Sequence, residues 1–352
     1  MTTPKAEEGT KGSYVLPSPP TYARERYLAS DASQAFEKLK EYGIAVIPNI
    51  IPEDLIRETK KGVFSGLEEA FPGFCRDDKS TWRLIRDHGA KHAQLIQEYG
   101  LGWMEPVVNL RQHPRIAQTF AELWSAQMQA KVGPHDLFSS ADGLSVYLNT
   151  EDSRGGFNRP KTGAWLHWDR RPDDPVWSVQ GFVNVYKTCE GGASFQCLTR
   201  SHGLQHAFVE RFPETKDKRF HLLANQEQAD FYLLRGCKHV CIAAMPADLV
   251  LWDSRLIHCG KAAEKTARRL KRMVIYVSMQ PKRFASKKDV ELKKRAFKQL
   301  RSTSHNAAAG VQLFTKYARV RCAKDDELKR RSRPVAVAPK LTALGRSLFG
   351  VE

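Results

Sequence analysis

A histidine and a carboxylate stand two positions apart in the middle of this chain, at His167 and Asp169. They belong to the run 165–169, whose aromatic and aliphatic residues are typical of a strand. Side chains two apart on a strand share one face, so an imidazole nitrogen and a carboxylate oxygen would point to the same place. The pair therefore suggests a metal site. Because a His-x-Asp pair is also common by chance, the interpretation depends on the rest of the chain.

A third ligand is available at His258, 89 positions after Asp169. It follows the apolar run 249–252 through a turn. Two histidines and one carboxylate form the ligand face of non-haem Fe(II) centres, which leaves three positions of an octahedral ion open. Arg269 and Arg272 introduce the next apolar run, and either could bind the far carboxylate of a bidentate 2-oxo acid.

These residues can meet only if the chain between them folds into neighbouring strands. From residue 143 onward, apolar and polar residues alternate in short runs separated by turns such as 190–192. This pattern predicts a closed or sandwiched all-β core over about 143–280. The predicted strands are 144–148, 164–169, 176–186, 193–198, 238–244, 249–252 and 273–279.

The segments around this core have helical spacing. A short helix over 35–42 is predicted to end at Gly43, and an apolar strand follows at 44–47. Pro52 suits the first turn of a helix that runs to about residue 70. Further segments of helical character are predicted at 80–99, 113–131, 204–236, 286–302 and 306–318.

Three regions follow from these patterns. Residues 1–30 are rich in Pro, Ser, Thr and charge, and are predicted to be a flexible leader. Residues 31–285 are predicted to form one domain, in which an N-terminal helical buttress supports the β core. Residues 286–352 are predicted to be a basic C-terminal helical extension and tail.

Composition narrows the class of protein. The formal net charge of +17 favours an acidic partner such as a nucleic acid, a phosphate compound or an anionic lipid. The seven cysteines are odd in number and form no CxxC pair, which favours a reduced, intracellular chain. The first twenty residues lack an apolar signal region, and no apolar run approaches the ~18 residues of a membrane span. We therefore expect a soluble protein of the cytoplasm, or of the nucleus in a eukaryote.

Four segments, in this order and spacing, carry a resemblance to a known family. They are 36–48, 165–169, the Gly-Gly strand 190–198 with its turn at 200–202, and 252–258 followed by Arg272 and 274–279. The chain resembles the phytanoyl-CoA dioxygenase-like branch of the Fe(II)/2-oxoglutarate-dependent oxygenases over about residues 35–282. It departs from the family at Arg200, where glycine usually precedes Ser-His, so the geometry of that turn is open.

The resemblance implies a mainly β core with flanking helices, built as a double-stranded β-helix (a jelly roll, or cupin-like fold), and α+β overall. It implies Fe(II) on His167, Asp169 and His258, with 2-oxoglutarate and dioxygen as cosubstrates. The reaction implied is hydroxylation of a C–H bond with release of succinate and CO2. Halogenating relatives lack the carboxylate ligand, so Asp169 favours hydroxylation. Arg272 is the first choice for the far carboxylate of 2-oxoglutarate, and Arg269 is the competitor.

Other polar or aromatic residues near these motifs are weaker candidates. Tyr147 and Asn149 would contact the cosubstrate, while Trp165, Gln180 and Arg255 would contact the substrate. Core packing explains Trp165 equally well, and an ion pair with Asp253 is the more conservative role for Arg255.

The substrate is expected to be a small or anionic molecule. Nucleic acid is a possible partner that no recognisable motif supports. One alternative is a non-catalytic β-helix binding module with a basic surface for nucleic acid or another anionic ligand. A second alternative is a cupin-like dioxygenase that needs no 2-oxo acid.

Overall fold

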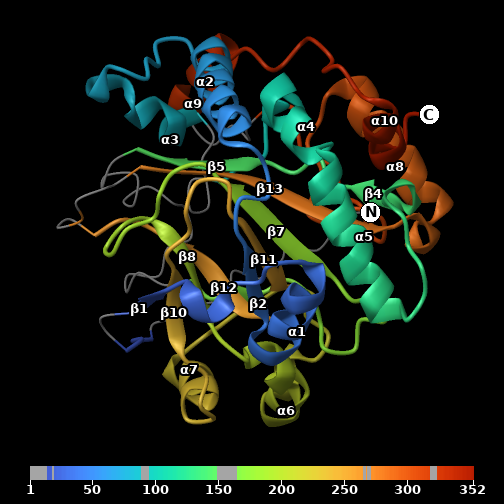
Figure 1. Ribbon diagram of the computed structural model, residues 1–352. Coiled ribbons are helices and arrows are strands. Elements are labelled where there is room, and N and C mark those ends of the chain that lie inside the picture. Colours follow the sequence, from blue (N-terminus) through green and yellow to red (C-terminus); the bar gives the residue numbers. More distant parts are fainter. Residues whose placement is uncertain are drawn as a thin grey trace, which may run out of the picture.

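Two β-sheets, both mostly antiparallel, form the centre of the computed structural model, and helices flank them (Figure 1). The structure describes residues 14–17, 20–88, 95–148, 165–264, 267, 271–317 and 323–352. Among the strands of these residues, only β1 and β10 pair in parallel. The prediction of a mainly β core with flanking helices is therefore confirmed.

The six-stranded sheet contains the strands that carry both candidate histidines. Its order is β1 (Thr21–Ala23), β10 (His239–Ile242), β8 (Ser194–Leu198), β12 (Ile257–Lys261), β6 (His167–Trp168) and β9 (His221–Leu222). Short strands such as β6 and β9 have few ladder hydrogen bonds, so their position depends on their neighbours.

The seven-stranded sheet contains the longest strand of the described chain, β13. Its order is β2 (Ile44–Ile47), β11 (Leu249–Asp253), β7 (Val179–Asn184), β13 (Arg272–Pro281), β5 (Leu144–Tyr147) and β3 (Leu95–Ile96), with β4 (Leu137–Ser139) paired to β13.

Alternation along β2 and β11 determines what each face of the seven-stranded sheet covers. Leu249 and Leu251 pack into the large cluster formed with the helices. Val250 and Trp252 point the other way and join Phe195 of the six-stranded sheet in a second cluster. Since successive strand residues face opposite sides, an apolar strand of this kind is buried on both faces. The layers are therefore helices, seven-stranded sheet and six-stranded sheet.

The N-terminal helices cover one face of the seven-stranded sheet. They are α1 (Ala32–Tyr42), α2 (Glu53–Ala70), α3 (Arg83–His88), α4 (Glu105–Arg111) and α5 (Pro114–Met128). Helix α1 ends as predicted, because Gly43 adopts a left-handed conformation with φ of 78°. Among the described residues of 80–99, where a helix was predicted, α3 is the one α-helix, and Leu95–Ile96 pairs with β5 as strand β3.

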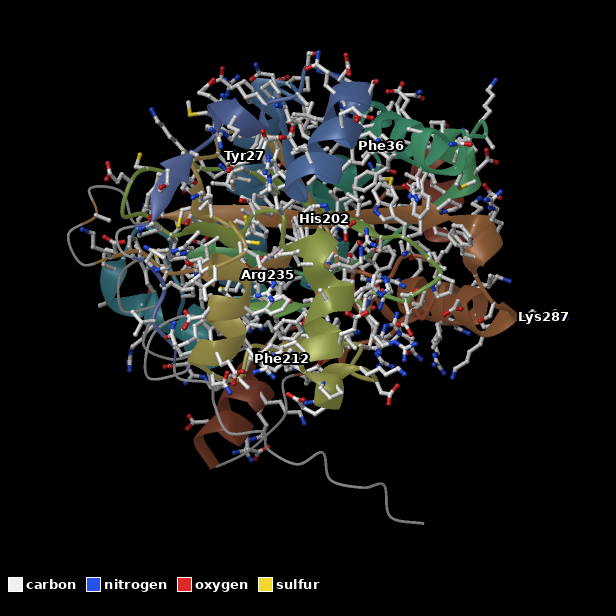
Figure 2. All side chains as sticks on the ribbon, turned by 90° about the horizontal axis from the view of Figure 1, so that it is seen from below. Tyr27, Phe36, His202, Phe212, Arg235 and Lys287 are labelled. Carbon is white, nitrogen blue, oxygen red and sulfur yellow. The ribbon has the colours of Figure 1, made fainter. Side chains whose placement is uncertain are left out.

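Later helices lie at the ends of the sheets. Helices α6 (Gln205–Arg211) and α7 (Gln226–Leu233) form the lower end of the molecule in Figure 1. Helices α8 (Lys287–Gln299), α9 (Ala323–Arg331) and α10 (Ala343–Phe349) follow the last core strand. Helix α8 carries the basic run, and Lys287 at its start lies at the edge of the molecule (Figure 2). None of the helices in the described ranges is long and apolar enough to cross a membrane.

The prediction of a helix over 306–318 is wrong for the described residues 306–317. That segment forms turns, and Thr303 and Leu313 pair as an isolated antiparallel bridge. Gly310 is left-handed with φ of 76°, which a continuous α-helix does not allow. The segment is therefore a loop that folds back on itself, not a second basic helix.

Part of the stretch predicted to be a flexible leader packs on the core. Strand β1 pairs with β10, and Tyr14 is buried, with its hydroxyl oxygen accepting a hydrogen bond of 2.8 Å from the backbone N–H of Leu166. The first thirteen residues lie outside the described ranges.

The turn at Arg200 has the geometry that a glycine would favour. Arg200 is left-handed, with φ of 69°. Its guanidinium bonds Glu41 at 2.9 Å and lies over the ring of Tyr42 at 5.3 Å from the centroid. These contacts stabilise a backbone conformation that is strained for a residue with a Cβ. The left-handed turn therefore forms although the residue in it carries a side chain.

Candidate metal centre

Strands β6 and β12 bring two histidines together. They pair antiparallel, and His167 stands directly opposite His258 in the register. Residues in direct register project to the same face of a sheet, so both imidazoles enter the space between the two sheets. Their ring centroids are 4.5 Å apart.

Asp169 completes a compact set of three possible metal ligands. One oxygen is 3.7 Å from Nε2 of His167, and the other is 3.5 Å from Nε2 of His258. One ligand atom from each residue lies within 4.8 Å of the others. This group is the only cluster of three or more His, Cys, Asp or Glu in the described chain that could hold a metal ion.

Backbone carbonyls orient both rings. Nδ1 of His167 lies 3.0 Å from the carbonyl oxygen of Trp165, and Nδ1 of His258 lies 2.8 Å from that of Leu256. A carbonyl oxygen can only accept, so each Nδ1 carries the proton in these bonds. Each Nε2 is then left with its lone pair directed to the shared centre, as a metal ligand requires.

Two contacts hold the carboxylate of Asp169 in place. Its backbone N–H donates to the carbonyl oxygen of Ser254 at 2.9 Å. The side-chain amide of Gln180 donates to a carboxylate oxygen at 2.7 Å and also reaches Ser254 Oγ at 3.2 Å. Because Gln180 lies on β7, the facing sheet helps to position a ligand carried by the six-stranded sheet.

The protonation states of these three residues suit a cation. Burial lowers the pKa of His258 to about 3, helped by the neighbouring His167, and burial likewise lowers the pKa of His167. Burial alone would raise the pKa of Asp169, but the imidazoles of His305, His167 and His258 and the bond from Gln180 outweigh it, so that pKa is lowered. Neutral imidazoles and an ionised carboxylate are the forms that coordinate a metal.

A cavity of about 590 Å³ opens beside the three ligands. Arg272, the first residue of β13, also lines it and is only 2% exposed. Its Nη1 is buried without a hydrogen-bond partner among the described residues. No carboxylate of the described chain lies within ion-pair distance of Arg272. Its guanidinium makes cation–π contacts with Phe182 and Tyr147, with the guanidinium carbon 5.1 and 5.7 Å from the ring centroids. The cavity thus combines a possible metal site with a buried cation.

The structure places the remaining predicted residues in different surroundings. Trp165 lines the cavity and stacks on His167, with centroids 4.5 Å apart. Gln180 also lines it but bonds a metal ligand, so its amide is already engaged. Tyr147 is buried opposite Arg272 in the register of β5 and β13. Asn149 and Arg269 lie outside the described residues.

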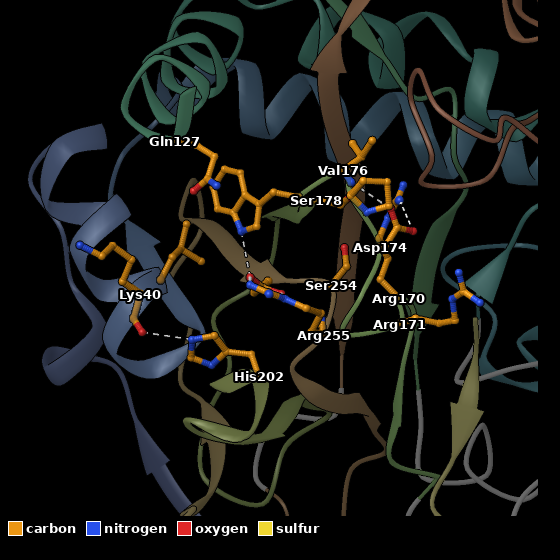
Figure 3. A pocket seen from close by; sticks show the side chains of 14 residues that line it. Lys40, Gln127, Arg170, Arg171, Asp174, Val176, Ser178, His202, Ser254 and Arg255 are labelled. Atoms are coloured by element: carbon orange, nitrogen blue, oxygen red, sulfur yellow. Dashed lines mark hydrogen bonds and ion pairs between the residues drawn. The ribbon is translucent and has the colours of Figure 1, made fainter. Parts of the chain in front are cut away.

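Arg255 does not line the metal cavity. Its guanidinium bonds both carboxylate oxygens of Asp253, at 2.9 and 2.7 Å. It lines a separate cavity of about 400 Å³ beyond Ser254, where Arg170 pairs with Asp174 at 2.7 Å (Figure 3). The ion pair with Asp253, the more conservative role for Arg255, is therefore observed.

Sequence reasoning missed a group of cavity residues from outside the predicted core strands. They are Arg219, Phe220 and Leu222 from the insertion, and Ser304, His305, Asn306, Gln312 and Phe314 from the C-terminal extension. The polar run at 304–306 was the available signal, but it lies at the junction of two predicted helices, 286–302 and 306–318, and was assigned no role.

No protein-family model matches the chain. A protein of Aspergillus versicolor, Ava biosynthesis cluster protein O, is 28% identical over 250 residues, which are 66% of this chain and 72% of that protein.

Two solved structures illustrate the structural likeness. GlcNAc Inducible Gene 2 of Candida albicans is 12% identical, has a TM-score of 0.56, and is matched over 91% of this chain and 76% of its own, which shows a shared fold. The epimerase SnoN in complex with Fe3+, alpha ketoglutarate and nogalamycin RO is 14% identical over 71% of this chain and 84% of its own, with a TM-score of 0.46.

Proposed function

We propose that the chain is an Fe(II)- and 2-oxoglutarate-dependent dioxygenase, which hydroxylates a C–H bond of a small molecule and releases succinate and CO2. The observation that carries the proposal is the convergence, in one cavity, of the possible metal site and the buried Arg272. A metal site alone suits many reactions. A buried cation beside it suits a cosubstrate that chelates the metal at one end and carries a carboxylate at the other.

Iron fits the three ligands. Two neutral imidazoles and one carboxylate are the protein ligands of non-haem Fe(II) oxygenases, and they leave positions open for cosubstrates. With 2-oxoglutarate and dioxygen, the iron would supply the oxidising chemistry. The chain's own residues orient the ligands: the carbonyls of Trp165 and Leu256 hold the two rings, and Gln180 holds the carboxylate.

Arg272 is the residue proposed to bind the far carboxylate of 2-oxoglutarate. A buried guanidinium without a carboxylate partner is costly, and a bound ligand carboxylate would offset that cost. Its unpartnered Nη1 supports this role. Tyr147, beside Arg272, is proposed as a neighbour of the same carboxylate.

The fold and family are part of the proposal. Two mostly antiparallel sheets, with metal ligands on one and the cosubstrate arginine on the other, support a double-stranded β-helix and the phytanoyl-CoA dioxygenase-like branch. The carboxylate ligand Asp169 supports hydroxylation. The relative from A. versicolor is named for a biosynthesis cluster, which supports a small-molecule substrate.

The test is formation of succinate from 2-oxoglutarate with and without Fe(II). We expect iron-dependent succinate in the wild-type chain and its loss in His167→Ala and Asp169→Ala. The matched controls are His206→Ala and Asp217→Ala, since both residues are exposed and outside the cavity lining. Both controls should retain activity.

Two results would contradict the proposal. Retained turnover in His167→Ala and Asp169→Ala would show that iron at this site takes no part in the reaction. Failure of the anaerobic protein to bind Fe(II) and 2-oxoglutarate would favour a non-catalytic binding module.

A further inference from the structure

Two segments outside the predicted core strands line the rim of the metal cavity. The insertion rim consists of Arg219, Phe220 and Leu222. The C-terminal rim consists of Ser304, His305, Asn306, Gln312 and Phe314. Neither segment supplies one of the three possible metal ligands, and Leu222, on β9, connects the insertion rim to the six-stranded sheet.

Hydrogen bonds hold the C-terminal rim against the core. The N–H of Ser304 donates to the carbonyl of Gln312, which closes the loop on itself. The N–H of Thr303 donates to the carbonyl of Ala141 at 2.9 Å, and Gln280 of β13 accepts from the N–H of Ala308 at 2.9 Å. The loop is thus fixed to the seven-stranded sheet, so its side chains are presented to the cavity in a defined arrangement.

The two rims also contact one another and the metal strand. A Cβ on Gly310 would lie 2.9 Å from the guanidinium nitrogens of Arg219, so the loop backbone packs directly on that side chain. Arg170, next to the ligand Asp169, donates to Asn306 Oδ1 at 2.9 Å. The rims therefore form one continuous wall.

The wall and its surroundings are rich in aromatic rings. Phe220 is 53% exposed, although large apolar side chains are usually covered, and its ring centroid is 5.0 Å from that of His167. On the other side of the ligands, Trp165 stacks on His167, and Phe195 stacks on His258 at 5.4 Å. Phe314, Trp252 and Tyr276 line the same cavity. Such a lining favours a flat aromatic molecule, because rings pack on rings with defined geometry.

A few polar groups stand among these rings. Ser304 Oγ and Trp252 Nε1 are buried without hydrogen-bond partners among the described residues. His305 also lines the cavity, and its imidazole helps to lower the pKa of Asp169. It does not belong to the group of three possible metal ligands. Buried polar groups without partners are costly, so a ligand oxygen among them would be stabilised.

From this arrangement we infer that the two rims form a subsite for a flat aromatic or polycyclic molecule that carries a hydroxyl or carbonyl oxygen. Phe220 packs on the ring system, and His305 hydrogen-bonds the oxygen. The inference rests on the proposed function only in identifying this molecule as the class of substrate. It also differs from an anionic substrate, since the buried cation of the cavity, Arg272, is assigned to the cosubstrate.

The probe is 2-naphthol, which is flat, neutral and hydroxylated, and the comparison ligand is decahydro-2-naphthol, which has the same skeleton without aromatic rings. Isothermal titration calorimetry on the full chain should give affinity for 2-naphthol about 10-fold higher than for the saturated alcohol. Phe220→Ser should weaken 2-naphthol binding about 10-fold, and His305→Ala about 5-fold.

Matched variants serve as controls. Leu234→Ser replaces another exposed apolar side chain, at the end of α7, and His135→Ala replaces an exposed histidine outside this cavity. Neither should change 2-naphthol binding. Equal affinity for the two alcohols, or wild-type affinity in Phe220→Ser, would overturn the inference.

The same variants separate this inference from the proposed function. Phe220→Ser should bind Fe(II) and 2-oxoglutarate as the wild-type chain does. Weakened 2-naphthol binding with normal iron binding supports the subsite. A wild-type chain that binds neither Fe(II) nor 2-oxoglutarate would contradict the proposed function. The 2-naphthol titrations of the same chain would still support or overturn the subsite.

Discussion

The metal strands and the cavity rims are built by different means. Strands β6 and β12 place His167 and His258 by regular antiparallel pairing, and the facing sheet adds Gln180 and Arg272. The C-terminal rim is a loop, held by isolated backbone hydrogen bonds and by the side chain of Gln280. Regular pairing leaves little freedom in where a side chain points, while a loop can change with few consequences for the sheets.

This difference suggests a division of labour. The sheets would determine which reaction occurs, because they carry the possible ligands and the buried cation. The rims would determine which molecule is accepted, because they carry the exposed Phe220 and the additional imidazole of His305. Substitutions in the sheets should therefore affect metal and cosubstrate, and substitutions in the rims should affect the substrate alone.

The largest effect is expected from Arg272→Met. Removing the buried guanidinium should weaken 2-oxoglutarate binding about 100-fold, within the range for truncating one partner of a buried charge pair, and should leave Fe(II) binding intact. Calorimetry with 2-oxoglutarate measures the change. Arg255→Met is the matched control, because that arginine lines the other cavity. Equal losses in both variants would show that Arg272 has no special role.

A smaller effect is expected from Gln180→Leu. The change removes the hydrogen bond to the Asp169 carboxylate, which should weaken Fe(II) binding about 10- to 100-fold, as is typical for the partner of a ligand. Anaerobic metal titration measures it. Gln112→Leu changes another buried glutamine, at the end of α4, and should bind iron normally. Unchanged affinity in Gln180→Leu would mean that the backbone alone positions Asp169.

The last effect concerns stability and not binding, and involves Lys293 on α8, whose neighbour Asp289 accepts a hydrogen bond from the N–H of Val311 in the rim loop. Burial, with the charge of Lys282, lowers the pKa of Lys293 from 10.5 to about 7. Between these values the unfolded chain binds the extra proton, so Lys293 makes stability rise with pH, by at most about 1.4 kcal/mol per unit.

Replacing Lys293 with Met should remove that rise. Urea unfolding at pH 7, 8 and 9 measures the difference between variant and wild type. Lys294→Met, at an exposed position on the same helix, should keep the wild-type pH dependence. Parallel pH profiles for Lys293→Met and the wild-type chain would show that Lys293 keeps its proton in the folded protein.

Sequence reasoning succeeded where local pattern and final position coincide. His167 and Asp169 come together as their spacing predicted, although β6 ends at Trp168 and Asp169 directly follows it. The apolar run 249–252 predicted a strand, and the structure confirms it as β11. These features depend on spacing within a few residues, which a sequence displays directly.

Prediction from the sequence failed where contacts between residues far apart in the chain determine the conformation. The segment around His305 has helix-compatible composition, but bonds to Gln280 and Ala141 hold it as a loop. Phe220 precedes a two-residue strand that exists only because β6 is available to pair. Partners that lie far away in the chain are not visible in local spacing, so the rims could not be predicted.

The hydrogen bonds that orient both imidazoles affect which substitutions this site can accept during evolution. Each ring is anchored by the carbonyl two residues earlier in its own chain, at Trp165 and Leu256. Every amino acid carries that carbonyl, so no replacement at either anchor position deletes it. Substitutions at positions 165 and 256 would therefore keep the tautomer of each ring, because the backbone itself fixes it.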